Sequence, residues 1–333
     1  EVRAVFRRIM CGELDTVEYA ENEVVTATGE RRLIAWHNAI LRDDTGAIVG
    51  ALSSGEDITE RRQEEDTARR QQQAIVALAL DEAFISGDID ASARKLTESV
   101  ARALRVERVS VWFVENGERH LRCHDLYLRH IARHSSGQQL TAAEFPEYFA
   151  ALQQGRVINA RLARTDPRTS EFAEVYLEPN GIASLLDATI RLHGQVAGVV
   201  CLEQVGEPRT WRPDEIAFAG QVADQMAHAL ANAEREEAEA ALRESEQKYR
   251  LLADNTIDTI WLMDMDRRFL YVNPGIVRLG GYTPEEVIGS RIEDYCDARN
   301  RALVEQQIEN ALEALPDFQG ITFEITLRDR NDN

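Results

Sequence analysis

Lysine and paired cysteines are nearly missing from this sequence. Only two of its 38 basic residues are lysine, and we read this arginine bias as a matter of composition rather than function. The four cysteines, Cys11, Cys123, Cys201 and Cys296, lie far apart and form no CxxC pair. This spacing excludes a disulfide framework and a cysteine-based zinc site, and it suits a reducing compartment such as the cytoplasm.

The sequence also lacks a long apolar run and an excess of positive charge. No stretch of about 18 apolar residues is present, so we expect no membrane contact by this segment. The formal net charge of −20 disfavours binding to nucleic acid or to anionic lipid. The motifs GxxxxGK[ST], GxSxG and HExxH are absent as well, so we expect no catalytic residue.

What is present indicates several small domains. A chain of 333 residues exceeds one ordinary domain of roughly 100 to 150 residues. Residues 18–58 alternate as an antiparallel meander, with turns at 28–30 and 43–46. The side chains expected on its apolar face are Leu33, Ala35, His37, Ala39 and Leu41. Such a sheet needs a covering layer, so we expect its other half before residue 1 and interpret the chain as an excised fragment.

The middle of the chain alternates between helical and strand patterns. Residues 57–73 are polar, lack glycine and proline, and predict a helical linker with Thr59 as N-cap. Apolar residues then recur at helical spacing from 93 to 104, after the possible cap Asp90. Strands are predicted at 106–114 and 118–128, with a turn at 116–117, and a hairpin is predicted around His193-Gly194.

A long helix is predicted from about residue 214 to 254, with Pro213 in its first turn. Its apolar stripe comprises Val222, Met226, Ala229, Ala233, Ala238, Leu242, Ser245, Tyr249 and Leu252. The stripe changes register between 233 and 238, which indicates either a switch point or a loose solvated helix. The helices at residues 60–80 and 221–252 both combine an apolar stripe with dense flanking charge. This combination predicts a parallel homodimer through these two segments. Beyond the helix, strands are expected at 259–264 and 268–273, and Thr283 and Glu286 form a capping box.

Three segments resemble known signalling domains. The run SEQKYRLLADNTIDTIWLMD with RFLYVNPGIVRLGGYTPEEVIG resembles the start of a PAS domain. The run RRLIAWHNAILRDDTGAIVG followed by GEDITERR resembles the end of another PAS domain. Residues 75–234 resemble a GAF domain through HLRCHDLY, DPRTSEF, GIASLLDATIRLHGQVAGVVCLEQVG and TWRPDEIAFAGQVADQMAHAL. Together these resemblances cover nearly the whole chain.

The resemblance implies an α+β fold class: GAF and PAS domains, each an antiparallel sheet with flanking helices, joined by long coiled-coil-like helices. The predicted boundaries are the end of a PAS domain at 1–62, a linker at 63–80, a GAF domain at 81–234, a linker at 235–253 and a truncated PAS domain at 254–333.

The resemblance also implies a role in bacterial signal transduction. Such modules occur in sensor histidine kinases and in proteins that make or degrade cyclic di-GMP. We therefore expect a sensory input and relay region that binds a small ligand, dimerises, or both, and regulates an output domain elsewhere in the same polypeptide. The only histidine followed by an acidic residue, His124, falls in a predicted strand, and Gly280-Gly281 continues as Tyr-Thr rather than as GGDEF, so we expect no output activity in this chain.

Two alternatives stay open. One is a ligand-free dimerisation spacer. The other is a thiol redox sensor at Cys123 or Cys201, or a haem or metal sensor at the dense histidines His120, His124, His130 and His134. A strand would place His120, His124 and His130 on one face and Cys123 on the other, so we assign no metal site. The residues specify neither the ligand nor a cofactor.

The candidate binding residues follow from these assignments. A GAF pocket is predicted between the sheet and residues 134–177, a long connection that mixes aromatic and polar side chains. Its candidate residues are His134, Phe145, Tyr148, Phe149, Asp166, Arg168, Phe172 and Tyr176, with Arg168 as the anchor if the ligand is an anion. Trp261 and Asn273 are the PAS candidates, although core packing and helix capping are simpler roles for them. Asp57 and Thr59 resemble the PAS exit motif and would tie the last strand to the following helix.

Overall fold

The computed structural model describes residues 19–115, 117, 120–313, 328 and 330. The chain forms two compact units, Glu1–Glu236 and Glu237–Asn333. No helix among the described residues has the length and apolar character needed to span a bilayer. Cys11 and the start of the predicted N-terminal domain lie outside the described residues.

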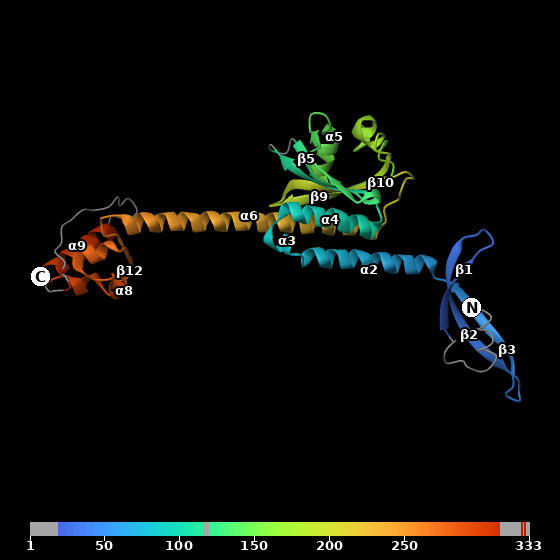
Figure 1. Cartoon of the computed structure of the whole chain (residues 1–333), viewed down its shortest axis with the longest axis horizontal. Helices are drawn as coiled ribbons and strands as arrows, with labels where there is room; N and C mark the ends of the chain where they lie inside the picture. Colours follow the sequence, from blue (N-terminus) through green and yellow to red (C-terminus); the bar gives the residue numbers. More distant parts are fainter. Residues whose placement is uncertain (1–18, 116, 118–119, 314–327, 329, 331–333) are drawn as a thin grey trace. The chain divides into compact units, whose positions relative to one another are not determined.

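The first unit begins with a meander of β1 (Tyr19–Val25), β2 (Arg31–Arg42) and β3 (Ile48–Asp57), paired antiparallel in that order (Figure 1). The predicted turns are confirmed at both connections. The predicted uniform apolar face is wrong, because Ala35 is buried while His37 and Ala39 are exposed. Asn38 is buried instead and accepts a hydrogen bond from the Ser53 hydroxyl (2.7 Å).

Helices α2 (Thr59–Ala79), α3 (Glu82–Ser86) and α4 (Ile89–Leu104) follow. Thr59 is the first residue of α2 rather than its N-cap, which is Ile58. The side chain of Asp88, not that of Asp90, caps α4 by accepting a hydrogen bond from the Ala91 amide (3.0 Å). Gly87 precedes it with a φ of 74°, so the chain turns sharply before the extended cap residue.

The main sheet has the order β6-β5-β4-β10-β9-β8, with β7 paired to β5, and every pairing is antiparallel. Its strands are β4 (Arg108–Glu115), β5 (His120–Leu128), β6 (Arg133–Ser135), β7 (Gln139–Thr141), β8 (Val157–Ala160), β9 (Ile182–Leu192) and β10 (Gln195–Val205). The predicted β9–β10 hairpin is confirmed. Its turn residues His193 and Gly194 both have positive φ, as a tight two-residue turn requires.

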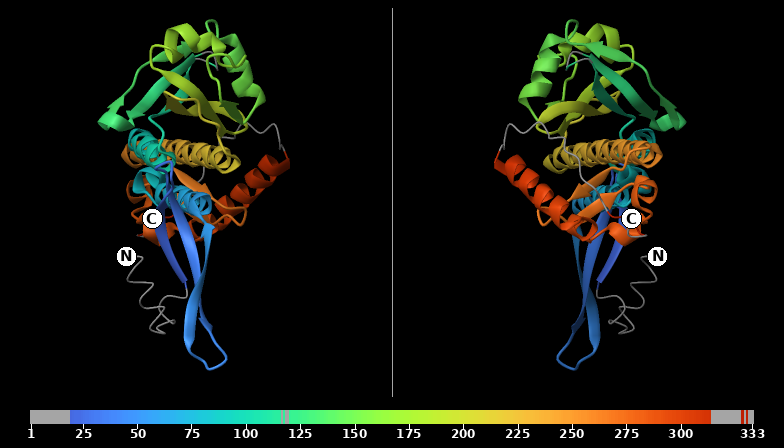
Figure 2. Two further views of the ribbon diagram at one scale, coloured as in Figure 1. Left: turned by 90° about the vertical axis from the view of Figure 1, so that its right-hand side faces the viewer. Right: turned by 90° about the vertical axis from the view of Figure 1, so that its left-hand side faces the viewer.

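Each face of this sheet carries its own apolar core. On one face α4 and the first half of α6 (Pro213–Asn255) pack against residues such as Leu186 and Val200, and α2 packs on α4. On the other face α5 (Pro146–Gln154) and the segment around Phe172 cover residues such as Leu185 and Val199. Figures 1 and 2 show these two layers on opposite sides of the strands. Because side chains alternate along a strand, neighbouring residues of β9 and β10 serve different cores.

Helix α6 has the predicted extent, and its apolar stripe divides into two parts. Val222, Met226 and Ala229 are fully buried in the core of the first unit, so they form no exposed seam. Leu242 and Tyr249, further along the helix, are exposed. The change of register between residues 233 and 238 therefore marks the point where the helix leaves the core of the domain.

The second unit contains β11 (Trp261–Met263), β12 (Phe269–Val272), α7 (Gly275–Gly280), α8 (Pro284–Val287) and α9 (Ala298–Glu313). Strands β11 and β12 pair antiparallel, as predicted. The predicted capping box at Thr283 and Glu286 is confirmed at the start of α8. Its core gathers Phe269, Val272, Ile276 and Val287 with neighbouring apolar residues.

Candidate functional site

A small cavity lies in the main sheet on the face covered by α5. The strands contribute Trp112, Leu185, Asp187, Cys201 and Glu203 to its wall. Strand β7 contributes Leu140, and the covering segments contribute Tyr148, Phe172, Tyr176 and Leu177. Its volume of about 20 Å³ is enough for roughly one water molecule. The cavity is therefore too small for a larger ligand in this structure.

Asp187 is the most unusual residue of this cavity. Strand alternation turns it toward the cavity, where its side chain is only 2% exposed. The Tyr148 hydroxyl donates a hydrogen bond of 2.7 Å to Asp187 Oδ2, whereas Oδ1 has no hydrogen-bond partner among the described residues. Burial raises the pKa of Asp187 from 3.8 to about 7. This site therefore holds a buried carboxyl group with one acceptor oxygen left unused.

A second buried carboxylate, Glu203, is fully partnered. The Arg108 guanidinium lies 2.6 Å from Glu203 Oε2, and the Tyr176 hydroxyl donates a hydrogen bond of 2.7 Å to Oε1. Arg108 also donates to the Tyr176 hydroxyl (3.2 Å), which closes the network. The attraction within a buried ion pair offsets its desolvation penalty when further hydrogen bonds satisfy its polar atoms, and both oxygens of Glu203 are bonded here. The two carboxyl groups thus differ, and Asp187 is the one available to a ligand.

The cysteines of this region are poor nucleophiles. Burial raises the pKa of the Cys123 thiol to about 12, and burial together with Asp187 raises that of Cys201 well above its ordinary range. The thiolate is the reactive form of cysteine, and it is suppressed at both positions. This argues against the thiol redox alternative.

The structure brings together some of the predicted pocket residues. Tyr148, Phe172 and Tyr176 line the cavity. Phe145 and Phe149 pack in the same core, and the Phe145 and Phe172 ring centroids are 4.6 Å apart.

His134, Asp166 and Arg168 are not among the residues that line the cavity. The Arg168 guanidinium is bonded to both oxygens of Asp166 (2.9 and 2.8 Å) and to the Asn159 carbonyl (2.8 Å). Those hydrogen bonds from Arg168 lower the pKa of Asp166. Since its guanidinium is already engaged, Arg168 is poorly placed to anchor an anion in this cavity.

His134, from the predicted histidine cluster, lies on the face of the sheet that α4 covers. His134 contacts Asp125 through Nδ1 (2.9 Å) and Glu98 through Nε2 (3.2 Å). The predicted alternation is wrong here, because β5 has a bulge at His124 and ends before His130, which lies in the 3₁₀ turn η2 (Arg129–Ile131). Within the described residues, no group of three or more histidine, cysteine or acidic side chains is arranged to hold a metal.

The two candidate residues of the predicted PAS domain, Trp261 and Asn273, have roles that differ from each other. Trp261 lines a second cavity of about 20 Å³ and packs edge to face on Phe269. Asn273 does not cap α7, whose cap position is Pro274. Its fully buried amide donates to the carbonyls of Ala253 (2.6 Å) and Asp258 (3.0 Å), and its Oδ1 accepts from the Ile260 amide (2.9 Å). Asn273 thus ties β12 to the end of α6.

The predicted relay residues join β3 to α2. Asp57 Oδ1 accepts hydrogen bonds from the amide (3.0 Å) and hydroxyl (2.6 Å) of Thr59. Thr59 Oγ1 in turn accepts a bond from the Leu33 amide on β2 (2.7 Å). The first residue of the helix is therefore held by two strands of the N-terminal sheet.

Sequence reasoning missed Asp187, Glu203 and Arg108. The available signal was an isolated charge inside an apolar strand, as in LLDATI and VVCLEQ. A charged residue on the inward face of such a strand must be paired or lie at a functional site, because burying an unpaired charge is costly.

Two known domain families match this chain in sequence. The family model of the GAF domain matches residues 88–230, and that of the PAS fold matches residues 247–332. The N-terminal sheet precedes both matches. No curated protein matches the chain in sequence.

Solved structures resemble parts of the chain at low identity. The GAF domain of an Acinetobacter phosphoenolpyruvate-protein phosphotransferase is 15% identical, over 52% of this chain and 95% of its own, with a TM-score of 0.40. The photosensory core module of a Stigmatella aurantiaca phytochrome is 14% identical, over 76% and 52%, with a TM-score of 0.46. A free methionine-R-sulfoxide reductase from Neisseria meningitidis is 11% identical, over 50% and 89%, with a TM-score of 0.38.

Proposed function

Because the chain contains a GAF domain at residues 88–230 and a PAS domain at residues 247–332, we propose that it is a sensory input region whose GAF cavity binds a small ligand through Asp187. GAF and PAS domains are sensory signalling domains. The observation that carries the proposal is the unused acceptor oxygen of Asp187 in a cavity. A buried polar atom without a partner is costly, so a ligand that supplies a donor gains affinity there.

The chemistry of the wall defines the class of ligand. Its polar groups are two carboxyl groups, the hydroxyls of Tyr148 and Tyr176, and a thiol. The Arg108 charge is already neutralised by Glu203. Such a wall favours a compact molecule that donates hydrogen bonds, such as a protonated amine, an amidine or an amino-substituted heterocycle. It disfavours an anion.

Binding requires the cavity to open. The cover includes η4 (Ala173–Leu177), a single π-helical turn, and such turns often occur at functional sites. Asp187 and Cys201 face the cavity, while their neighbours Leu186 and Val200 face α6 on the other side of the sheet. Displacement of β9 and β10 by a ligand would therefore change the packing of α6. The ligand shifts the equilibrium by its difference in affinity for the two states.

The remaining parts of the proposal extend beyond this cavity. We infer that α6 carries the change to the PAS domain and from there to an output domain in the same polypeptide, a histidine kinase or a cyclic di-GMP enzyme, in a cytoplasmic homodimer. The N-terminal sheet would be the end of a preceding PAS domain, an assignment supported by the bonds that Asp57 and Thr59 make between β2, β3 and α2.

The alternative is a ligand-free spacer, and the small volume of about 20 Å³ favours it. A thermal-shift screen of the whole chain with guanidinium, imidazole, small amines and aminopurines separates the two. We expect at least one compound to raise the melting temperature of the wild type but not of Asp187→Asn. Asp44→Asn, an exposed change in the β2–β3 turn, is the control and should respond like the wild type. A screen in which every compound fails would support the spacer.

A further inference from the structure

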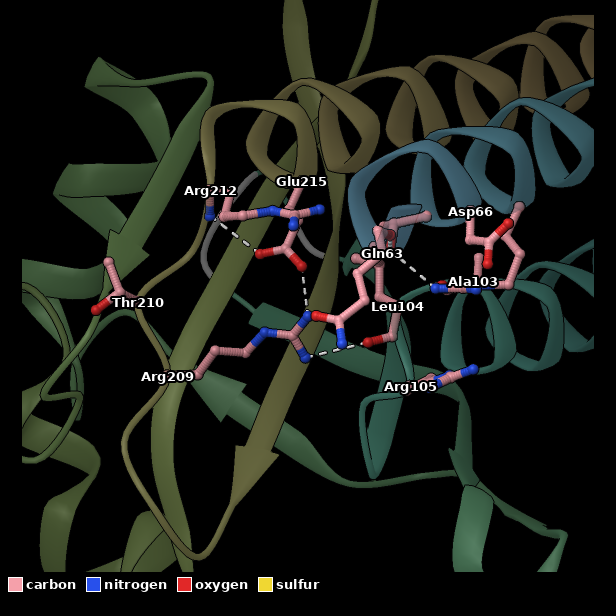
Figure 3. A pocket seen from close by; sticks show the side chains of 11 residues that line it. Gln63, Asp66, Ala103, Leu104, Arg105, Arg209, Thr210, Arg212 and Glu215 are labelled. Atoms are coloured by element: carbon pink, nitrogen blue, oxygen red, sulfur yellow. Dashed lines mark hydrogen bonds and ion pairs between the residues drawn. The ribbon is translucent and has the colours of Figure 1, made fainter. Parts of the chain in front are cut away.

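A larger cavity lies on the helix side of the GAF domain. It encloses about 530 Å³, within the usual range for small-molecule sites. Its wall comes from three segments: the first half of α2, the end of α4, and residues 209–215, which lead into α6. Figure 3 shows the α4 carbonyl of Leu104 facing Arg209, and Glu215 between Arg209 and Arg212.

The side chains that line this cavity carry a net positive charge, whereas the chain as a whole is negative. Four arginines, Arg70, Arg105, Arg209 and Arg212, line the cavity together with only two carboxylates, Asp66 and Glu215. The chain as a whole has a net charge of −20. A local excess of guanidinium groups in an acidic protein concentrates anions at that place.

Among the residues that the structure describes, two of the four arginines lack a carboxylate partner. Arg209 pairs with Glu215, and Arg212 pairs with Asp214 (2.9 Å). Within the described part of the chain, the Arg70 side chain donates to the Ala103 carbonyl (3.3 Å) and the Thr67 hydroxyl (2.9 Å) and to no carboxylate. The Arg105 side chain makes neither a hydrogen bond nor an ion pair with the described residues.

The backbone at Arg105 supports a specific role. Arg105 ends α4 with a φ of 55°, a left-handed conformation in which glycine is strongly preferred. An arginine there is unfavourable for the backbone. Its presence adds an arginine to the lining of a cavity that already contains Arg70.

We propose that this cavity binds a small, multiply charged anion through Arg70 and Arg105, and that the anion fastens α2 to the start of α6. Guanidinium groups bind phosphate and carboxylate oxygens in pairs, which suits both classes of anion. One bond already joins the two helices, from Gln71 Nε2 to Asp214 Oδ2 (3.1 Å). An anion would add contacts between the helix that enters the domain and the helix that leaves it. This proposal does not depend on a ligand at Asp187.

Isothermal titration of the whole chain tests the proposal, with inorganic pyrophosphate in one arm and citrate in the other, at about 0.15 M salt. We expect at least one of them to bind with a Kd below about 1 mM, and the tighter one identifies the class of anion. The variant R70Q/R105Q should weaken this binding at least about tenfold. The control R102Q changes an exposed arginine on the same helix outside the cavity and should leave the Kd unchanged.

Three results would overturn the proposal. They are a failure of both anions to bind the wild type, binding that survives R70Q/R105Q, and an equal loss in R102Q, which would indicate unspecific attraction. Single R105Q, at an exposed residue, replaces the double variant if the latter fails to fold. Hydrogen exchange should also slow in residues 63–71 when pyrophosphate or citrate, whichever binds tighter, is added to the wild type. Asp187→Asn should still bind that anion, which separates this site from the smaller cavity.

Discussion

At the scale of single residues, Asp187 couples stability to pH. Its pKa is about 7 in the folded chain because burial disfavours the ionised form, against 3.8 ordinarily. A raised pKa means that the folded state holds its proton more tightly than the unfolded state does. This contribution to stability is complete below about pH 4, falls as the pH rises toward 7, and is lost above that value.

We therefore predict that Asp187→Asn changes the pH profile. Between pH 5 and 8 the wild type should lose about 2 to 4 kcal/mol of unfolding free energy relative to the variant. Urea denaturation at several pH values measures the unfolding free energy of both proteins. The difference between wild type and variant cancels the contribution of all other titrating groups, because both proteins contain them. A difference that stays constant from pH 5 to 8 would show that Asp187 does not titrate in this range.

Arg108 has a structural role that can be measured separately. Arg108→Met leaves Glu203 as a buried carboxylate without its cation, so we expect a loss of about 3 kcal/mol in unfolding free energy. The double variant Arg108→Met/Glu203→Leu should recover much of this loss, because the unpaired charge is gone. Arg243→Met at the exposed pair with Glu239 is the control and should cost less than about 0.5 kcal/mol. Equal losses in both single variants would contradict this assignment.

The residue scale is also where the sequence was least informative. Tyr148, Phe172 and Tyr176 could be assigned to the cavity because a long aromatic connection must pack on the sheet. The position of Arg168 could not be predicted from the sequence. Its pairing with Asp166 depends on the conformation of a local turn, which the residue types do not specify. The burial of Asp187 likewise depends on the cover that α5 and the segment around Phe172 provide on its face of β9, which the sequence of the strand does not specify.

At the scale of secondary-structure elements, Gly87 controls the approach of α3 to α6. It has a φ of 74°, and a Cβ placed there would lie 2.4 Å from the backbone nitrogen of Ala233. Gly87→Ala should therefore cost about 2 to 4 kcal/mol and loosen α6, since the obstacle is backbone. Gly194→Ala is the matched control, with a φ of 83° and open space around it, and should cost only about 1 kcal/mol. Thermal unfolding compares the two, and similar losses would mean that the contact with α6 is unimportant.

The extents of the elements were more predictable than their caps. The run from Pro213 to Asn255 lacks an interior proline and carries apolar residues at helical spacing on both sides of the register change, so its length could be predicted. Asp88 and Asp90 are equivalent candidates by composition alone. The structure selects Asp88 because Gly87 ends α3 in a left-handed conformation and leaves the next residue extended. Local backbone geometry, which composition does not specify, decides such a cap.

At the scale of the whole molecule, the N-terminal sheet is the part that we expect to open first. Four of its large apolar residues, Val25, Leu41, Val49 and Leu52, are exposed, whereas the GAF core is buried on both faces of its sheet. A sheet with few buried contacts has a low free energy of local opening. Hydrogen exchange should therefore be fast in residues 19–57 and slow in β9 and β10. Equal protection in the two regions would contradict this prediction.

Self-association is also a property of the whole molecule. The structure shows which part of the predicted α6 stripe is exposed and so could form a dimer contact. The first half of the predicted stripe on α6 is used inside the GAF domain, since Val222, Met226 and Ala229 are fully buried. The second half is exposed over Leu242, Tyr249 and Leu252. These residues recur at the 3.5-residue spacing of a coiled coil. A parallel homodimer is therefore predicted through residues 238–252 rather than through the whole length of the helix.

Light scattering over a range of concentrations tests this dimer. We expect a micromolar Kd, about 8 kcal/mol, because a short seam with alanine and serine positions is weak. Leu242→Glu/Leu252→Glu should make the chain monomeric, since like charges would meet in the seam. Gln247→Glu adds a charge at an exposed position off the stripe and should leave the dimer intact. A dimer that survives Leu242→Glu/Leu252→Glu would have to form through α2 or the domains themselves, and a wild type that stays monomeric well above micromolar concentration would exclude the seam.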